Sequence, residues 1–422
     1  MSAAHPQPAA PAPRRPVLGA LRHRNYRLFF TGQVISQVGT WMQSIALPWL
    51  VLILTHNDFL VGLTLAFQFI PMLVLGPVGG IVADRFPKRR ILLVTQASYM
   101  LPSLFLFLVT HFGVAQYPMV LAAALTVGLI NVFDVPARQA FSIEMVGRED
   151  LMNAIALNSS VFNAAAVIGP SIAGVLIGFL GVQLCFLINS VSFLGPLAGL
   201  LLMRNLPRLL RGAEESAGSV WERIREGAAY ARHDPLVGTV LLTVAAFSMF
   251  AMNRLTLLPL FADKVLHIGA AGFGFLMAAL GLGALAGAIS MAVRPQSPNG
   301  RRQFWFGVAW VVMLLVFSVS RTLWLSLATL FGAGVCQMLF TTTANTRIQL
   351  VTPDHLRGRV MALYAQAMMG VGPIGSTMAG GLSALFGPPV AMAVGAGLAA
   401  ATIIGVRVWR PAVFVAAPSQ PR

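Results

Sequence analysis

The sequence predicts an all-α polytopic membrane protein, and three observations lead to this fold class. Of the 422 residues, 57% are hydrophobic and only 10% are charged, whereas soluble domains carry about 25% charged residues. The apolar residues fall into twelve runs, each near the length of about 20 residues that a membrane helix needs. The basic residues gather between alternate runs. Together they predict 12 transmembrane helices in two six-helix bundles.

The twelve apolar runs form two sets of six. The first set lies at roughly 27–54, 60–82, 91–110, 117–135, 153–178 and 181–203. The second set lies at roughly 237–261, 270–293, 304–320, 323–345, 360–384 and 388–408.

Five segments follow from these runs. They are a disordered cytoplasmic tail at 1–26, a first bundle at 27–203, a cytoplasmic linker at 204–236, a second bundle at 237–410 and a cytoplasmic tail at 411–422. The first residues are rich in Pro and Ala and lack the apolar stretch of a signal peptide. The second part of the linker predicts an amphipathic helix, which either lies on the membrane surface or is a solvated connection.

The positive charges predict how the chain is oriented in the membrane. Twelve spans place 26 of the 29 Lys and Arg residues on the side of the two termini. Lys264 and Arg321 lie on the other side, and Arg254 lies inside a run. Basic residues stay in the cytoplasm, so both termini are predicted to be cytoplasmic. The net charge of +16 therefore reports topology, and no nucleic-acid partner is expected.

Catalytic and metal-binding patterns are missing from the sequence. It has no His/Cys cluster with metal-ligand spacing and no phosphate-binding Gly-Lys-Ser/Thr loop. We therefore expect no metal, no cofactor and no enzyme activity. Cys185 and Cys336 both lie in apolar runs, which predicts free thiols.

Two Gly-Pro pairs indicate an internal repeat. Gly169-Pro170 and Gly372-Pro373 lie 203 residues apart, each within a similar small-residue segment and after a polar loop. Six helices followed by six similar helices is the plan of transporters built from parallel repeats.

The loop at 79–90 reads Gly80-x-x-x-Asp84-Arg85-x-x-Lys88-Arg89-Arg90, and the corresponding loop at 294–302 keeps bases but lacks the acid. The loop at 79–90 resembles the loop 2–3 motif of the major facilitator superfamily, although Pro87 stands where many members have Gly. Gly169, Pro170 and Gly174 are similar to the helix-5 motif of exporters and antiporters. The segments 131–141, 153–163 and 356–364 look like the enterobactin-exporter-like branch, which includes siderophore and drug exporters.

The resemblance covers about residues 19–408 and implies the major facilitator fold in the bacterial cytoplasmic membrane. We expect a monomer. It also implies a conformational latch, with Asp84 against the start of helix 11 near Arg359–Met361 and Lys88 paired with Asp134. This latch would hold the two halves together on the cytoplasmic side when the cavity opens outward. Its residues are Gly80, Asp84, Arg85, Lys88, Arg89, Arg90, Asp134 and Arg138. The alternative is a basic cluster that only sets topology.

Asp134 is the candidate for a proton-responsive group. Of the thirteen acids, it comes closest to the interior of a predicted span, where acids mark coupling sites. Arg138 lies four residues later on the same helical face, so a structural pair with Arg138 or Lys88 is the alternative. Proton coupling itself is implied by the resemblance.

Polar residues on four helices are candidates to line a substrate cavity. Those of helix 1 recur at i, i+3, i+4, i+7 and i+11, which places them on one face. The resemblance puts helices 1, 4, 7 and 10 around a central path. The candidates are Gln33, Ser36, Gln37, Thr40, Ser44, Asn131, Asn253, Arg254, Gln337, Thr341 and Asn345. The alternatives are hydrogen bonds between helices and, for Arg254, snorkelling to the outer surface.

These patterns favour a secondary transporter that exports a bulky amphipathic molecule, such as a siderophore, drug or secondary metabolite, by proton-coupled alternating access. An importer of a small metabolite is disfavoured by the helix-5 motif. A membrane receptor or scaffold without transport is disfavoured by the loop 2–3 cluster and the polar face of helix 1.

Overall fold

The computed structural model describes residues 19–204, 220–293 and 298–414. All regular structure in these residues is helical, and eleven segments are long and apolar enough to cross a membrane. The sequence-based fold class, an all-α polytopic membrane protein, is thereby confirmed.

The first bundle contains the spans before the linker. Its elements are η1 (Gly19–Arg22), α1 (Arg24–Thr55), α2 (Asp58–Arg85), α3 (Lys88–His111), α4 (Tyr117–Leu180), α5 (Gln183–Ser192) and α6 (Leu194–Leu202). Helix α4 supplies two spans, Tyr117–Gly147 and Asp150–Leu180. The chain turns between them at Gly147, whose φ of 69° is a conformation that glycine adopts readily.

The second bundle follows the linker helix α7 (Val220–His233). Its elements are α8 (Pro235–Phe250), α9 (Arg254–Lys264), α10 (Gly269–Val293), α11 (Gly300–Val319), α12 (Leu323–Val351), α13 (Asp354–Met369), α14 (Gly372–Phe386), α15 (Pro388–Trp409) and η2 (Pro411–Phe414). Helices α8 and α9 together form one span.

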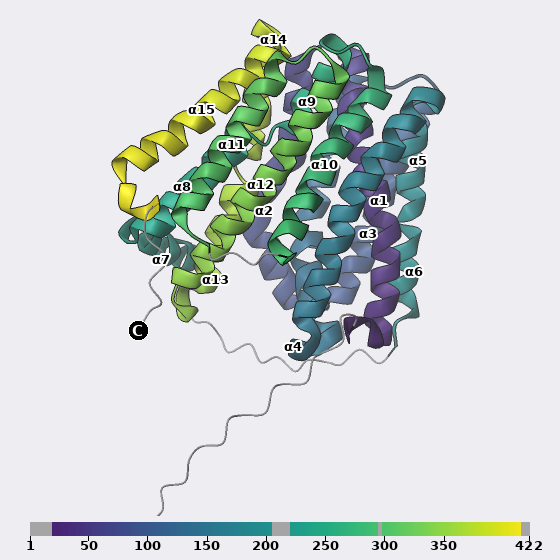
Figure 1. Ribbon diagram of the computed structural model, residues 1–422. Helices are drawn as coiled ribbons and strands as arrows, with labels where there is room; N and C mark the ends of the chain where they lie inside the picture. The colour runs from purple at the N-terminus through teal and green to yellow at the C-terminus, as the bar shows by residue number, and fades with distance from the viewer. Residues whose placement is uncertain (1–18, 205–219, 294–297, 415–422) are drawn as a thin grey trace, which may run out of the picture.

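The span predicted at 360–384 is divided into two shorter helices. Helix α13 has 16 residues and α14 has 15, so neither reaches the length of a full span by itself. The break lies at Gly370 and Val371, and Pro373 then occupies the first turn of α14, where a missing N–H costs nothing. Figure 1 shows α13 near the bottom of the fold and α14 at the top. Together they therefore make the crossing predicted at 360–384, which brings the eleven long spans to twelve.

Three other sequence-based boundaries need correction. The span predicted at 117–135 continues to Gly147, so Asp134 lies well inside it rather than at its end. Residues 19–26, assigned to a disordered tail, form η1 and the first turn of α1, and Ala20 and Tyr26 are fully buried. The start of the C-terminal tail likewise folds as η2. The remaining tail residues and 205–219 of the linker lie outside the described residues.

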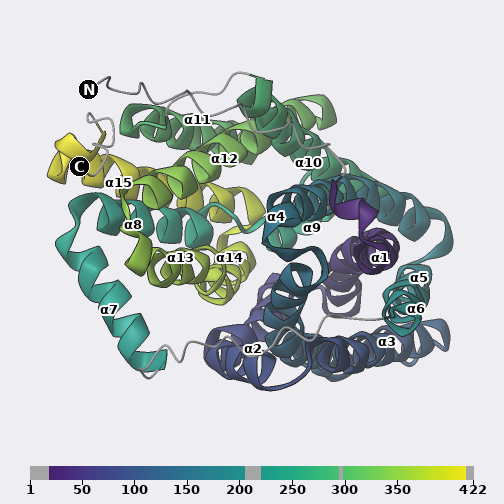
Figure 2. The same cartoon turned by 90° about the horizontal axis from the view of Figure 1, so that it is seen from below.

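The two bundles lie side by side, with α1 to α6 on one side of the molecule and α8 and α11 to α15 on the other (Figure 2). We call the end at which α2 meets α3, with Arg85, Lys88, Arg89 and Arg90, the basic end. It is the lower end of the fold in Figure 1, where α7 and α13 lie. The other end, where α2 begins at Asp58, is the opposite end. Near the opposite end the core runs from one bundle into the other, and Trp49 of α1 stacks on Phe273 of α10 at 6.3 Å.

Candidate functional site

Glycine pairs bring the backbones of the two bundles into contact in the half toward the opposite end. A Cβ atom built on Gly174 of α4 would lie 2.8 Å from the Cα atom of Gly274 in α10. A Cβ atom on Gly62 of α2 would lie 2.2 Å from the carbonyl oxygen of Ser376 in α14, and one on Gly380 would lie 3.1 Å from Cα of Gly62. Such close approach of membrane helices requires small residues. Gly174 of the helix-5 motif is therefore part of the interface.

The other two residues of that motif lie one turn before Gly174. A Cβ atom on Gly169 would lie 2.5 Å from Cβ of Trp41 in α1, so Gly169 fits α4 against its own bundle. Pro170 offers its carbonyl oxygen at the interface, 2.7 Å from a Cβ atom built on Gly274. In this motif, Gly169 therefore contacts α1 of the same bundle, whereas Pro170 and Gly174 contact α10 of the other bundle.

A buried acid also joins the bundles at the opposite end. Asp58, the first residue of α2, is only 2% exposed. Its Oδ1 atom lies 2.5 Å from Nζ of Lys264 at the end of α9, and its Oδ2 atom accepts a hydrogen bond of 2.7 Å from Ser383 of α14. We call the set that closes this end the opposite-end seal: Asp58, Gly62, Gly174, Lys264, Gly274, Gly380 and Ser383.

No sequence pattern singles out Asp58 or Lys264. An acid in the first turn of a helix is ordinary because it favours the positive end of the helix dipole. Its partner is 206 residues away and looks like a charge at a loop. Only the arrangement of the bundles brings the two together.

At the basic end, two basic residues of the predicted latch, Lys88 and Arg89, bond within the first bundle. Lys88 pairs with Glu144 of α4 at 3.0 Å, and Arg89 donates to the carbonyl oxygens of Leu200 and Leu201 at 2.9 and 3.2 Å. The predicted pair of Lys88 with Asp134 is wrong for this conformation. Asp134 lies ten residues before Glu144 on the same helix, which is about 15 Å further along the helix from the basic end.

The acid of the predicted latch is exposed. Within the described residues, the side chain of Asp84 makes no hydrogen bond or ion pair, and the same holds for the side chains of the exposed Arg85 and Arg90. Arg359 of α13, which is the first part of the predicted eleventh span, pairs instead with Glu226 of the linker helix α7. The contact between Asp84 and the start of α13 is thus absent from this conformation. It stays a prediction for a conformation that is closed at the basic end. Gly80 has open space beside it.

Asp134 is the centre of a buried polar cluster in the first bundle. It is 1% exposed and accepts hydrogen bonds from Thr95 at 2.7 Å and Gln96 at 2.8 Å, both on α3. Arg138 pairs with it on α4 and also donates to Gln33 of α1. We call these five residues the Asp134 cluster. It ties three helices together and realises the pair between Asp134 and Arg138 that the spacing predicted.

The polar face of helix 1 divides according to what its side chains bond. Gln33 and Ser36 are buried, and among the predicted set Gln33 bonds to another helix. Thr40 donates to the carbonyl oxygen of Ser36 at 2.9 Å and Ser44 to that of Trp41 at 2.7 Å. Gln37, which lies between Ser36 and Thr40 in the sequence, is half-buried. Interhelical bonding, the alternative to cavity lining, is therefore observed at Gln33.

Gln43, which the spacing did not include, bonds further along α1. Its Oε1 atom accepts from Ser103 of α3 and Asn189 of α5, each at 2.7 Å. Asn131 of α4 accepts from Tyr99 of α3 at 2.8 Å. These amide side chains connect the helices of the first bundle.

Arg254 and Gln337 are the second-bundle candidates that the structure brings together. They come from α9 and α12 and line one small pocket, together with Met252 and Trp310. Arg254 is half-buried and makes no ion pair within the described residues. It therefore points into the second bundle instead of snorkelling to the outer surface.

The remaining second-bundle candidates bond locally. Asn253 donates to the carbonyl oxygen of Met249 at 2.8 Å, and Thr341 to that of Gln337 at 2.9 Å. Asn345 accepts from Gln349 one turn later. Tyr364 of α13 reaches across to the carbonyl oxygen of Thr341 at 3.0 Å, which links the divided helix to α12.

Arg347 lies just beyond the run predicted at 323–345, but it belongs to α12 and is fully buried. It donates to Gln303 of α11 at 2.5 Å and to the carbonyl oxygen of Val413 in η2 at 2.6 Å. Arg347 thus anchors the start of the C-terminal tail. Cys185 and Cys336 are both free thiols, as predicted. In the described part of the chain, no three His, Cys, Asp or Glu side chains are grouped to hold a metal ion.

Two six-helix bundles that meet through close glycine contacts are the architecture of the major facilitator fold. The likeness to solved structures gives the same fold. A bacterial homologue of the lysosomal transporter Spinster superposes with a TM-score of 0.73 at 13% identity, covering 95% of this chain and 99% of that one. The nucleoside transporter NupG superposes with a TM-score of 0.69 at 11% identity, covering 90% and 98%.

The chain belongs to the transmembrane secretion effector family, whose family model matches residues 16–420. Among curated relatives, the enterobactin exporter EntS of Shigella boydii serotype 4 (strain Sb227) is 27% identical over 385 residues, which is 91% of each chain. EntS of Escherichia coli O127:H6 (strain E2348/69 / EPEC) is 28% identical over 385 residues and the same shares. The protein is thus a multi-pass membrane transporter for a small molecule.

Proposed function

We propose that the protein exports a bulky amphipathic small molecule, such as a siderophore, drug or secondary metabolite, by proton-coupled alternating access. The observation that carries the direction of transport is similarity over 91% of both chains to proteins named enterobactin exporters. The position of Gly174 at the bundle interface supports it, because this residue belongs to the exporter-type motif.

The proposed orientation places the basic end in the cytoplasm of a bacterial cell, within its cytoplasmic membrane. The support is the charge distribution, since Lys264 ends α9 and Arg321 lies between α11 and α12, both at the opposite end, while the other loops hold nearly all basic residues. The opposite-end seal would then close the external side. We propose a monomer as the transporting unit, since one chain contains both bundles.

Export requires the seal to break and the basic end to close. A rocking motion of the two bundles about the central path would do both. The pair of Asp58 with Lys264 would separate, and α13 would approach the end of α2. Asp84 would then replace Glu226 as the partner of Arg359, which gives the predicted latch a competing partner on the linker helix.

Asp134 is the proposed proton-binding group. Its charge balances Arg138 while it also accepts from Thr95 and Gln96. Protonation would remove that charge and release the guanidinium group of Arg138, which already bonds to Gln33 on helix 1. A proton bound at Asp134 would therefore change the hydrogen bonds between α1, α3 and α4. This change would couple proton binding to the position of the first bundle relative to the second.

Substrate recognition is proposed to involve Arg254 and Gln337 together with the polar face of helix 1. An unpaired guanidinium group inside a membrane bundle is costly unless it serves a function, and it suits an anionic or oxygen-rich molecule. Arg254→Ala should narrow the range of exported compounds. An unchanged substrate profile would exclude Arg254 from the substrate path.

The proposal is tested in two steps. Exported metabolites and drug sensitivity are first compared between cells with and without the gene, and loss of the gene should raise the intracellular level of one compound. Efflux of that compound is then measured in vesicles with and without a pH gradient. Accumulation inside cells that carry the gene would indicate an importer, and efflux that ignores a collapsed pH gradient would rule out proton antiport.

A further inference from the structure

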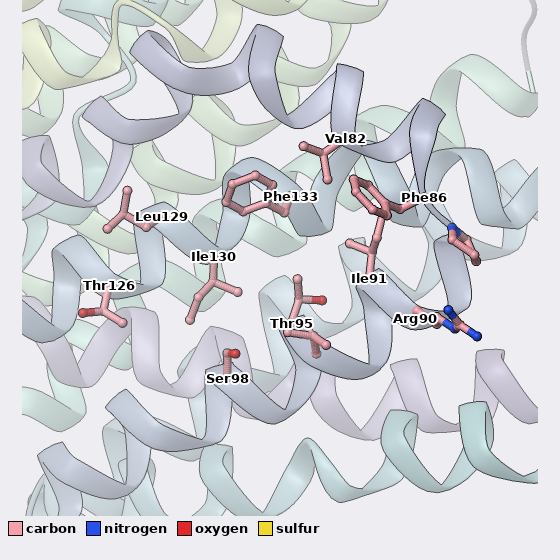
Figure 3. A pocket seen from close by; sticks show the side chains of 12 residues that line it. Val82, Phe86, Arg90, Ile91, Thr95, Ser98, Thr126, Leu129, Ile130 and Phe133 are labelled. Carbon is pink, nitrogen blue, oxygen red and sulfur yellow. The ribbon is translucent and has the colours of Figure 1, made fainter.

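The first bundle carries an apolar groove that the transport proposal does not use. It has a volume of about 460 Å³ and is lined by residues of α2, α3 and α4, which is within the usual size range of ligand sites. Figure 3 shows Val82 and Phe86 on one side, Ile91, Thr95 and Ser98 on the other, and Leu129, Ile130 and Phe133 between them. We call it the α2–α4 groove.

The exposure of its lining places the groove on the membrane-facing surface. Phe86 is 52% exposed, Val94 66% and Leu129 40%, and all lie in or beside membrane spans. Large apolar side chains remain exposed there because hydrocarbon chains cover them. A groove on this surface has the size and apolar lining that suit the acyl chain of a lipid.

One end of the groove is basic. Arg90 lines it at the end nearest the basic end of the molecule, and Thr126 lies at the far end (Figure 3). Within the described residues, Lys88 and Arg89 of the same motif already have partners, whereas Arg90 is exposed and has none. A guanidinium group beside an apolar groove matches a phosphate group joined to an acyl chain.

We propose that the α2–α4 groove binds an anionic phospholipid, with one acyl chain along Leu129, Ile130 and Phe133 and the headgroup phosphate on Arg90. This role is independent of the direction of transport. It gives the last base of the loop 2–3 motif a specific ligand, whereas Arg85 contributes only to the general positive charge of this end.

The test uses the full-length protein in detergent, titrated with dioleoyl-phosphatidylglycerol or dioleoyl-phosphatidylcholine, with bound lipid counted by native mass spectrometry. Both headgroups carry a phosphate, but in phosphatidylcholine the choline cation offsets its charge. The anionic lipid should therefore bind about fivefold more tightly, since one basic residue beside an anionic headgroup contributes about 1 kcal/mol. Arg90→Gln should remove this preference, while the matched control Arg85→Gln should keep it. Excess inorganic phosphate should not displace the lipid, because the acyl chain contributes most of the burial.

Leu129→Trp supplies an independent variant because it narrows the groove without changing charge. It should weaken binding of both lipids by about tenfold, since it removes space for several methylene groups. Arg90→Lys should lose part of the preference, because lysine lacks the planar fork of arginine. Equal binding of the two lipids, equal effects of Arg90→Gln and Arg85→Gln, or displacement by phosphate would each overturn the proposal.

Discussion

The two ends of α2 carry acids with opposite surroundings. Asp58, at the start of the helix, is 2% exposed and bonds to two helices of the other bundle. Asp84, in the last turn, is exposed and has no partner among the described residues. The end with few charges is thus the end at which charges join the bundles.

The same contrast holds beyond α2. Between described residues, the hydrogen bonds and ion pairs at the basic end stay within one bundle, as for Lys88 with Glu144, or join the linker helix to the second bundle, as for Glu226 with Arg359. At the opposite end, the glycine pairs first bring the backbones together, and Asp58 then reaches its partners. Close backbone packing therefore decides where an ion pair can form between bundles.

Overpacking the opposite-end seal should give the largest effect. Gly62→Ala places a Cβ atom 2.2 Å from the carbonyl oxygen of Ser376, and overpacking of this kind typically costs about 1–3 kcal/mol. Transport in vesicles should fall about tenfold or more. Gly76→Ala on the same helix meets nothing within 4 Å and should transport normally; equal rates for the two variants would show that the seal is not needed.

Neutralising the Asp134 cluster should come next. Asp134→Asn keeps the shape but removes the charge that pairs with Arg138, so efflux driven by a pH gradient should fall about tenfold, the effect of a lost charged hydrogen bond. Thr95→Val removes one neutral bond to the same carboxylate and should keep the dependence on the gradient. Gradient-dependent efflux by Asp134→Asn would eliminate Asp134 as the proton-binding group.

A smaller change is expected from the predicted latch. Asp84→Asn leaves the conformation described above intact but weakens closure at the basic end, so vesicle transport should fall about two- to fivefold, as for an exposed ion pair. Glu226→Gln frees Arg359 from its present partner and should not reduce transport. Full activity of Asp84→Asn at normal membrane expression would remove the latch.

The smallest effect is expected at the pair of Lys88 with Glu144. Both partners are in the first bundle and partly exposed, so Glu144→Gln should lower the unfolding temperature only slightly, corresponding to about 0–1 kcal/mol. Transport should stay within about twofold of wild type. A larger loss would mean that Lys88 acts between bundles after all.

Most of the fold could be predicted from the sequence because lipid imposes a simple rule on apolar runs. The rule fails where polar residues lie inside a span. The predicted run ends at 135 because Asp134 lies at its end and Arg138 follows, although the helix continues to Gly147. The run at 360–384 conceals a break because Gly370 and Val371 are as apolar as a helix interior.

The site was less predictable, and for a different reason. Neighbours on one helix, such as Asp134 and Arg138, follow from spacing. Partners on different helices depend on depth in the membrane and on bundle position, neither of which a local pattern contains. Asp58 with Lys264 was therefore missed, and Lys88 was paired with an acid at the wrong depth.

The reciprocal movement of the two ends provides the most direct test. Spin labels are placed at the exposed positions Val114 and Arg321 across the opposite end, and at Ile143 and Leu350 across the basic end. Distances are measured in wild type and in Asp58→Asn, which loses the pair with Lys264. Asp58→Asn should shift the populations about five- to tenfold, with longer distances at the opposite end and shorter distances at the basic end. Lengthening at the opposite end without shortening at the basic end would contradict a rocking transporter sealed by Asp58.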